Sequence, residues 1–592
     1  MRLFGLLLLS LLATGQLFSQ DITYTLDLSN SQHHELKISI LFTELEGESL
    51  EIRMPNSSPG RYALHNFAKN VYEEQAFDGA GNEVELVRLT PFTWEMPVTN
   101  GKARFDYTIY GNHADGTYLG VDAKKLHMNM PATFAYGTGL EDRKINLVIP
   151  KKEGWSVATQ LVKENETTYS APNYYYFYDS PTMVGKIDWR EWQVDGQTIQ
   201  LAMMHEGTNQ ELDDYTEWVK KVVAEQQSIY GELPSFDYGR YTFLVAYNPW
   251  VDGDGMEHRN STVCTSTGSL EKNASGLIGT ISHEFFHAWN IERIRPKSLE
   301  PFDFDQANLS EALWFGEGFT SYFDDLSLTR AGIYSPEQYV NSLVGGLNYV
   351  LNSPSREFRG PIKMSYNATF VDAGTANDAT NYSNNFVSYY SYGSVIGLGL
   401  DLTLRVEFNK TLDEYMRMVW EQYGKPEIPY TMENLEDVLA QLTNKNFAET
   451  FFKEQIQGSK IPDFDALFEE FGIKMSLQNP NSAYFANPKI NDNNQVQSTV
   501  MRGTAFYEAG IEQGDKIISV NGTTINTTAD LNREINAMEI GKTYAIEYEQ
   551  LGEVKTGSFT AKQDPRIMLS YLSDDKLSKK IVKRRNEWLE IK

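Results

Sequence analysis

Apolar and polar residues alternate along the first third of the chain. Between about residues 22 and 183, runs such as 35–40 (ELKISI) and 103–109 (ARFDYTI) carry an apolar side chain at every second position, and Gly, Pro and Asn turns separate such runs. Period-2 patterning in short segments predicts strands that each bury one face. We therefore expect an antiparallel β-sandwich in this part of the chain.

Helical periodicity replaces the alternation after about residue 188. Residues 387–407 are apolar on most of the helix circumference, which predicts a buried helix. Residues 353–385 are rich in Asn, Ser, Thr and Ala and predict a long loop. The other predicted helices cover residues 213–230, 273–290, 309–329, 432–443 and 448–456. A mainly helical block thus follows the sandwich.

The last part of the chain returns to strand patterning. Residues 479–562 are mainly strand-like, with one predicted helix at 529–538. The basic, weakly amphipathic tail from residue 574 predicts a solvated terminal helix rather than a membrane contact. The pattern as a whole predicts a multidomain α+β protein.

The N-terminus has the three parts of a secretory signal. Arg2 precedes an apolar run from residue 3 to about 13, and small and polar residues follow as far as Asp21. This run is shorter than the roughly 20 residues of a membrane-spanning helix, and no other stretch is long and apolar enough to span a bilayer. We expect cleavage near residues 16–20, no transmembrane segment, and export to the periplasm or cell surface of a bacterium.

Composition narrows the range of partners. The 592 residues carry 80 acidic and 52 basic side chains, a net charge of −28, which argues against a nucleic-acid partner. The single cysteine, Cys264, excludes an internal disulfide and a cysteine-based metal cluster. Because the chain has nine histidines, any two of them at metal-ligand spacing are informative.

Two of these histidines form such a pair. His283 and His287 belong to a His-Glu-x-x-His element inside a predicted helix. Residues i and i+4 share one helix face, so both imidazoles can reach one zinc ion at about 2.0–2.1 Å. Glu284 lies slightly around the helix, beside water whose pKa zinc lowers to roughly 7. The spacing therefore predicts a Zn²⁺ site with Glu284 as the catalytic base.

A catalytic zinc site with two histidines needs a third protein ligand, and a glutamate is a common one. Glu317 is the best supplier, because it lies in the next predicted helix within the apolar sequence WFGEGFT. Burial of this carboxylate would require a cationic partner. Glu311, Asp324 and Asp325 are the alternative ligands.

These motifs resemble the glycyl aminopeptidases, the M61 family of zinc peptidases, which is related to the M1 clan of alanyl aminopeptidases and leukotriene hydrolases. The resemblance implies a thermolysin-like, mainly α-helical catalytic domain of the gluzincin type. It also implies removal of small N-terminal residues, Gly or Ala, from peptides with a free N-terminus. The segments that carry the resemblance are HEFFHAWNIERIRPKSLEPFDF from His283, LWFGEGFTSYF around Glu317, GMEHRNST from Gly255, YYSYG from Tyr389 and MPNSSPGRY from Met54.

The resemblance also implies roles for residues outside the zinc motif. Glu257 matches the clan glutamate that receives the α-amino group of the substrate, a charge-assisted contact that only a chain end can make. Tyr390 matches the tyrosine that donates a hydrogen bond to the oxyanion, with Tyr389 and Tyr392 as alternatives. His258 either lines the substrate site beside Glu257 or is a structural histidine.

Residues 503–522 resemble a PDZ domain, through Ala-Gly-Ile followed by Gly-Asp-Lys-Ile-Ile-Ser-Val-Asn-Gly. Such domains commonly bind a peptide C-terminus as an added strand. The usual carboxylate-binding loop is not recognisable near residues 483–490, so a module that only packs against the catalytic block is the alternative. The expected division is a signal peptide (1–20), an N-terminal β-sandwich (21–185), a zinc metallopeptidase domain (186–475), a PDZ-like domain (478–565) and a C-terminal tail (566–592).

Two other functions compete with a zinc aminopeptidase. A zinc endopeptidase would cut internal bonds and accept N-acetylated peptides. A PDZ-based peptide-binding protein would carry a metal site without catalysis. The sequence argues against this last function, because neither a metal ligand nor the base is missing.

Overall fold

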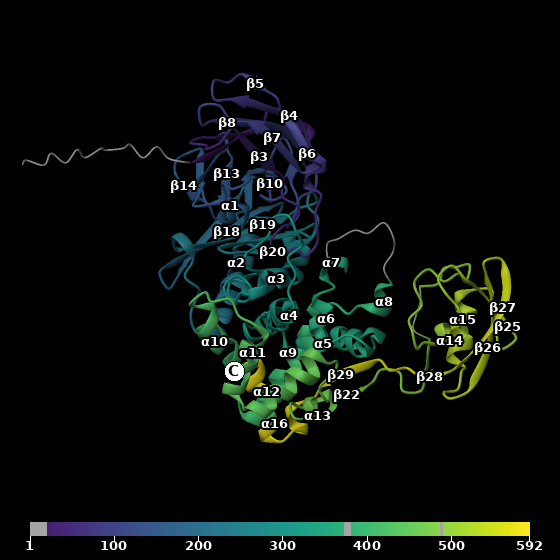
Figure 1. The fold of residues 1–592 in the computed structure, drawn as a ribbon. Coiled ribbons are helices and arrows are strands. Elements are labelled where there is room, and N and C mark those ends of the chain that lie inside the picture. Colours follow the sequence, from purple (N-terminus) through teal and green to yellow (C-terminus); the bar gives the residue numbers. More distant parts are fainter. Residues whose placement is uncertain (1–20, 372–380, 486–488, 592) are drawn as a thin grey trace, which may run out of the picture.

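A computed structural model describes residues 21–371, 381–485 and 489–591. The predicted signal segment, residues 1–20, lies outside the described residues. Within the described part of the chain, no helix is long and apolar enough to cross a membrane. Figure 1 shows β-strands at the N-terminal end, a helical middle and a separate strand-rich unit near the C-terminus, which confirms the predicted fold class.

The N-terminal region is a layered β-structure. Its strands alternate buried and exposed residues, as the period-2 pattern predicts, and β1 pairs with β12 in parallel while its other neighbour is antiparallel. The largest sheet has the order β14 (Val162–Lys163), β15 (Thr168–Ala171), β12 (Ile145–Val148), β1 (Ile22–Asp27), β2 (Glu35–Phe42), β8 (Ala103–Tyr110), β4 (Val71–Asp78) and β5 (Glu83–Val84). Two four-stranded sheets accompany it. One has the order β13 (Ser156–Thr159), β16 (Thr182–Gly185), β10 (Leu126–Met128) and β9 (Gly120–Val121). The other has the order β11 (Tyr136–Gly137), β3 (Ser49–Arg53), β7 (Thr93–Pro97) and β6 (Val87–Thr90).

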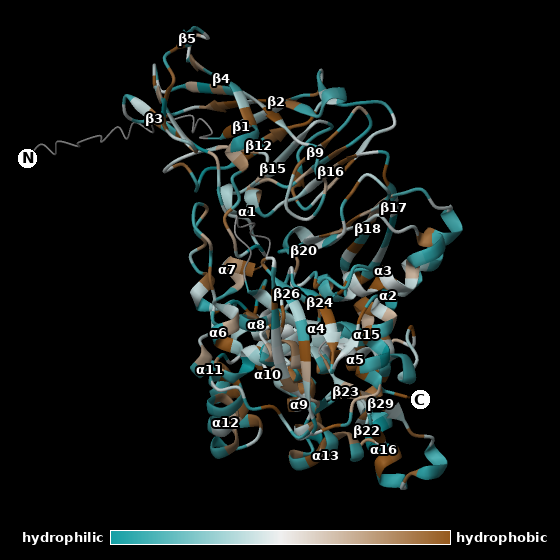
Figure 2. Ribbon diagram, turned by 90° about the vertical axis from the view of Figure 1, so that its right-hand side faces the viewer, coloured by the Kyte–Doolittle hydropathy of each residue, from teal (hydrophilic) through white to brown (hydrophobic). Residues whose placement is uncertain are grey.

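A five-stranded mixed sheet joins the sandwich to the helices. Its edge strand β20 pairs antiparallel with β21, and in both views it lies between the sandwich and helix α3 (Figures 1 and 2). The order is β17 (Asp188–Val194), β18 (Gln197–His205), β19 (Arg240–Tyr247), β21 (Ser261–Ser266) and β20 (Asp254–His258). This edge strand is therefore placed to contribute to a site between the two regions.

The helical block packs around one continuous apolar core. Helices α4 and α9 approach each other closely at Gly318 and Gly393. A Cβ atom at Gly318 would lie only 2.3 Å from the Cα atom of Gly393. This close approach brings the residues beside the two glycines together. The helices are α2 (Asn209–Tyr230), α3 (Leu270–Phe286), α4 (Leu313–Arg330), α5 (Pro336–Leu351), α9 (Tyr389–Thr403), α10 (Leu412–Val419), α11 (Met432–Leu442), α12 (Lys445–Phe451) and α13 (Phe464–Glu469).

The predicted loop over residues 353–385 is wrong in part. Three short helices interrupt it, α6 (Pro361–Ser365), α7 (Ala368–Val371) and α8 (Tyr382–Asn385), while residues 372–380 lie outside the described residues. Pro361 begins α6, and Met364 is buried in the same core as α4. Single-turn helices of this kind show too little periodicity to be predicted from the pattern.

The C-terminal strands form a small unit with its own core. Its sheet has the order β25 (Thr523–Thr524), β24 (Lys516–Val520), β26 (Thr543–Gln550) and β27 (Glu553–Thr560), with helices α14 (Ala505–Ala509) and α15 (Thr528–Asn536). The chain leaves the helical block through β22 (Ile473–Leu477) and returns through β29 (Ile567–Tyr571), which pairs with it. The strand-rich unit is thus an insertion whose two ends are tied together (Figure 1).

The tail is not the solvated helix that its basic composition predicts. Helix α16 (Lys579–Leu589) buries Trp588 and Arg585 completely. The Trp588 indole N–H donates to the Tyr322 hydroxyl at 3.0 Å, and Arg330 Nε donates to the Trp588 carbonyl at 3.1 Å. Trp588 thus docks the tail against α4, and even one of the basic residues of the helix, Arg585, is buried.

Candidate metal centre and substrate pocket

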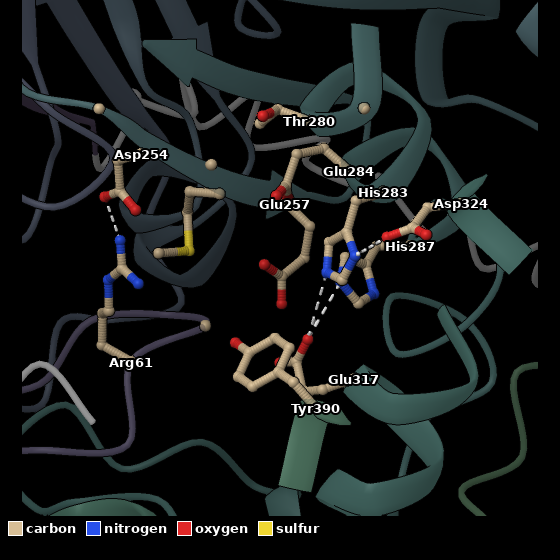
Figure 3. Close-up of a pocket in the computed structure, with 15 residues that line it drawn as sticks. Arg61, Asp254, Glu257, Thr280, His283, Glu284, His287, Glu317, Asp324 and Tyr390 are labelled. Carbon is tan, nitrogen blue, oxygen red and sulfur yellow. Dashed lines mark hydrogen bonds and ion pairs between the residues drawn. The ribbon is translucent and has the colours of Figure 1, made fainter. Parts of the chain in front are cut away.

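The two motif histidines converge with Glu317 on one point. His283 lies in the last turn of α3 and His287 directly follows this helix, so the two Nε2 atoms are 3.1 Å apart. Glu317 from α4 places Oε2 3.2 Å from His287 Nε2 and 3.7 Å from His283 Nε2 (Figure 3). Two imidazoles and one carboxylate are the ligand set of a common type of catalytic zinc site. The residues present therefore fit a zinc ion.

The Nδ1 atom of each imidazole lies within hydrogen-bond distance of an acceptor. His283 Nδ1 is 3.0 Å from Asp324 Oδ2, and His287 Nδ1 is 2.8 Å from the Asn290 carbonyl oxygen. With a metal ion bound, each ring would carry its proton on Nδ1, which leaves the Nε2 lone pair directed at the shared point. Asp324, an alternative ligand in the sequence, lies behind His283 and orients it.

Glu317 is almost fully buried, with 2% of its surface exposed. Burial raises the pKa of this carboxyl, but the imidazoles of His287 and His283 outweigh burial and hold the pKa well below its ordinary value. Its second oxygen, Oε1, accepts a hydrogen bond from the Tyr62 hydroxyl at 2.5 Å. The carboxylate is thus ionised and held at both oxygens.

Glu284 lies one residue along the helix from His283, against the backbone of β20. A Cβ atom at Gly255 would lie 2.1 Å from Glu284 Oε1, so a glycine is needed for this approach. Burial raises the pKa of Glu284 to about 7, although both motif histidines oppose the rise. Its Oε2 atom has no hydrogen-bond partner among the described residues. A carboxylate with this environment is suited to accept a proton near neutral pH.

The three candidate metal ligands, His283, His287 and Glu317, here called the metal-binding residues, open onto a cavity of about 470 Å³. Glu257 of β20 lies in its middle, as Figure 3 shows, and 7% of this residue is exposed. Burial raises its pKa, so a cation entering the cavity would find an energetically favourable partner there. The cavity is lined by Gly60, Arg61, Gly253, Asp254, Gly255, Met256, Glu257, Gly279, Thr280, His283, Glu284, His287, Glu317, Asp324 and Tyr390.

The three candidate tyrosines lie in different places. Tyr390, in the first turn of α9, lines the cavity, and its ring centroid is 6.0 Å from that of His283. Tyr389 is buried against the ring of Tyr62, and Tyr392 is fully buried. The structure therefore favours Tyr390 over the two alternatives as a group that meets substrate.

His258 does not line the cavity. Its Nδ1 atom is 2.8 Å from Asp179 Oδ1 in a buried contact with the sandwich. Neighbouring side chains on a strand point to opposite faces, so with Glu257 turned toward the cavity, His258 turns away from it. The structure therefore does not support the expected contact of His258 with substrate. It fits the alternative, in which His258 is a structural histidine.

Sequence reasoning missed two residues at this site. Arg61 forms an ion pair with Asp254 at the side of the cavity away from the metal-binding residues (Figure 3), and Tyr62 contacts Glu317. Both belong to the segment MPNSSPGRY, which the family resemblance includes but to which it assigns no chemistry. The presence of this segment in the resemblance was the sequence signal that could have identified both residues.

Comparisons with known families agree with this geometry. The family model of the peptidase M61 N-terminal domain matches residues 23–186, that of the M61 glycyl aminopeptidase matches residues 276–396, and that of the PDZ domain matches residues 471–559. The chain carries both M61 domains and a PDZ domain. The predictions of an M61 metallopeptidase and of a PDZ fold are thus confirmed, while the exact domain limits stay predictions.

Solved structures resemble this chain to different degrees. An aminopeptidase N family protein from Idiomarina loihiensis is 23% identical over 96% of this chain and 100% of its own, with a TM-score of 0.82. An M1 zinc metallopeptidase from Deinococcus radiodurans is 15% identical over 75% of this chain and 95% of its own, with a TM-score of 0.44. Yeast LTA4 hydrolase in complex with bestatin is 14% identical over 75% of this chain and 68% of its own, with a TM-score of 0.42. No curated protein sequence matches the chain.

Proposed function

We propose that this M61 protein is a zinc-dependent aminopeptidase that removes small N-terminal residues, Gly or Ala, from peptides. One observation carries the proposal: the buried carboxylate of Glu257 shares a single cavity with His283, His287 and Glu317. A site that combines a metal ligand set with a buried anion is suited to a peptide bond next to a free ammonium group.

His283, His287 and Glu317 would hold the zinc ion. Zinc bound there supplies Lewis acidity, which polarises a peptide carbonyl and promotes ionisation of water. Asp324 and the Asn290 carbonyl keep the two imidazoles oriented, and such outer contacts raise the basicity of histidine ligands.

Glu284 and Tyr390 would carry out the proton transfer and charge stabilisation. Glu284 accepts a proton from the attacking water and delivers it to the departing amine nitrogen, so it ends each turnover in its starting state. Tyr390 donates a hydrogen bond to the former carbonyl oxygen as negative charge develops there. Both side chains line the cavity that holds the metal-binding residues.

Glu257 would receive the α-ammonium group of the substrate. Gly60 of the sandwich crowds one side of this carboxylate, because a Cβ atom at Gly60 would lie 2.9 Å from Glu257 Oε2. A buried carboxylate in the same cavity as the candidate metal ligands supports an exopeptidase over an endopeptidase. Met256, Arg61 and Asp254 line the same side and support a preference for a small first side chain.

Reporter substrates test this proposal directly. We expect Gly and Ala reporters with a free amine to be hydrolysed, their N-acetylated forms to be hydrolysed far more slowly, and a chelator to abolish activity until Zn²⁺ is restored. Equal hydrolysis of free and N-acetylated reporters would instead identify an endopeptidase. Activity that survives complete metal removal would contradict the metal-dependent mechanism.

Export and peptide binding by the PDZ domain remain separate proposals. The apolar run at residues 3–13 supports export to the periplasm or cell surface, and N-terminal sequencing of the mature protein tests it. Residues 483–490, where a carboxylate-binding loop would be expected, include residues 486–488, which lie outside the described residues. Titration of the full chain with peptides that end in a free or an amidated carboxylate tests whether the PDZ domain binds a C-terminus.

A further inference from the structure

Three consecutive residues of the sandwich each contact a different carboxylate of the catalytic region. Gly60 lies against Glu257, Arg61 pairs with Asp254, and Tyr62 donates to Glu317. The first two of these carboxylates belong to β20 and the third to α4. The segment 60–62 is therefore built into the active site, although it belongs to the other region of the molecule.

The Tyr62 contact is the one that reaches the metal-binding residues. The Tyr62 hydroxyl lies 2.5 Å from Glu317 Oε1, while Glu317 Oε2 faces the nitrogens of His283 and His287. Tyr62 is 3% exposed, and its ring packs edge-on against Tyr389 at a centroid distance of 6.1 Å. The two oxygens of Glu317 thus have different neighbours, and the Tyr62 hydroxyl donates to the oxygen that does not face the histidines.

We propose that Tyr62 is a positioning residue that fixes Glu317 for metal binding, so that the sandwich completes the metal centre. Without the hydroxyl, Oε1 would be buried without this donor, and the carboxylate could rotate about its terminal bond. Leaving a buried acceptor unpaired is costly, and outer-shell partners of metal ligands typically contribute about 10- to 100-fold to metal affinity or activity.

A catalytic role for Tyr62 itself fits the geometry less well. Its hydroxyl is committed to Glu317, and Tyr62 is absent from the residues that line the cavity. Tyr390 lines that cavity and is the better placed phenol for contact with substrate. Tyr62 therefore acts through Glu317. This inference rests on the proposed function, since it requires Glu317 to be a ligand.

The test is zinc binding by the full chain with Tyr62→Phe, measured by competition with a fluorescent chelator. Phenylalanine keeps the ring and its packing, so we expect a folded protein whose zinc affinity is about 10- to 100-fold weaker than that of the wild type. Tyr24→Phe is the matched control, because Tyr24 is also buried and its hydroxyl donates to the Ala135 carbonyl in the sandwich at 3.0 Å. The control should bind zinc as the wild type does.

A double-mutant cycle with Glu317→Ala, which removes the acceptor of the Tyr62 hydroxyl, separates positioning from general packing. If Tyr62 acts through Glu317, adding Tyr62→Phe to Glu317→Ala should weaken the residual zinc binding by less than twofold, whereas an equal loss in both backgrounds overturns the inference. Wild-type affinity in Tyr62→Phe also overturns it and leaves the proposed function intact. Absence of zinc binding by the wild type would instead contradict the proposed function itself.

Discussion

The two ends of the cavity are built in different ways. At the metal-binding end, His283, His287 and Glu317 come from α3 and α4, which pack against each other within one core. At the other end, Arg61 of the sandwich meets Asp254 of β20, 193 positions further along the chain. The first end holds the groups suited to bond cleavage, and under the proposed function the second end would select the first residue of a substrate. Variants at the two ends should therefore change different kinetic quantities.

Glu284→Gln at the metal-binding end should have the largest effect. The amide cannot accept a proton, so kcat should fall by about 10²- to 10⁴-fold for every reporter substrate alike. Zinc content should stay stoichiometric, because Glu284 is not one of the three proposed ligands, His283, His287 and Glu317. Steady-state kinetics with Gly, Ala and Leu reporters, together with metal analysis, measure both quantities.

Glu271→Gln is the control for this prediction, since Glu271 is exposed in the first turn of the same helix. It should leave kcat and zinc content unchanged. A loss confined to one substrate in Glu284→Gln would contradict the assignment of chemistry to this end of the cavity.

Glu257→Gln tests the middle of the cavity and should have an intermediate effect. Loss of the charge removes a charge-assisted hydrogen bond worth about 1.5–3 kcal/mol, so kcat/KM for free-amine reporters should fall by about 10- to 100-fold. The slow hydrolysis of N-acetylated reporters should change little, because they carry no ammonium group. The ratio of the two rates is the quantity to measure.

Glu206→Gln, at an exposed position just after β18, serves as the matched control for Glu257→Gln. If Glu257→Gln lowers the rates on free and N-acetylated reporters by the same factor, Glu257 does not bind the amine. The exopeptidase assignment would then lose its main support.

Local patterns were sufficient to predict the metal-binding end. The spacing of His283 and His287 matches the helix period, and Glu317 is an acidic residue in an apolar helix. The histidine pair and the glutamate could therefore be identified without tertiary structure. Tyr62 could not be found in this way, because its partner Glu317 lies 255 positions away in another region. Contacts between regions depend on how surfaces dock, which leaves no periodic signal along either segment.

The same limit explains the errors outside the site. Trp588 anchors a tail whose basic composition predicts a solvated helix, and the single-turn helix α6 begins at Pro361 within a stretch of loop-like composition. Composition reports the average character of a segment, whereas one buried aromatic or apolar side chain can decide where that segment docks. His258 was placed in the site by adjacency, although strand alternation turns it away from Glu257.

Arg61→Ala at the selective end should have the smallest effect and change only the choice of substrate. Removing the guanidinium enlarges the cavity beside Met256, while Asp254 keeps a hydrogen bond from the Gly116 amide at 3.0 Å. Because one methylene group is worth about 1–3 kcal/mol in a hydrophobic pocket, the ratio of kcat/KM for Leu over Ala reporters should rise by about tenfold. Arg88→Ala, on the exposed surface of the sandwich, should leave this ratio unchanged. A uniform loss on all substrates would show that the ion pair only holds the two regions together, and the distinction between a chemical end and a selective end would fail.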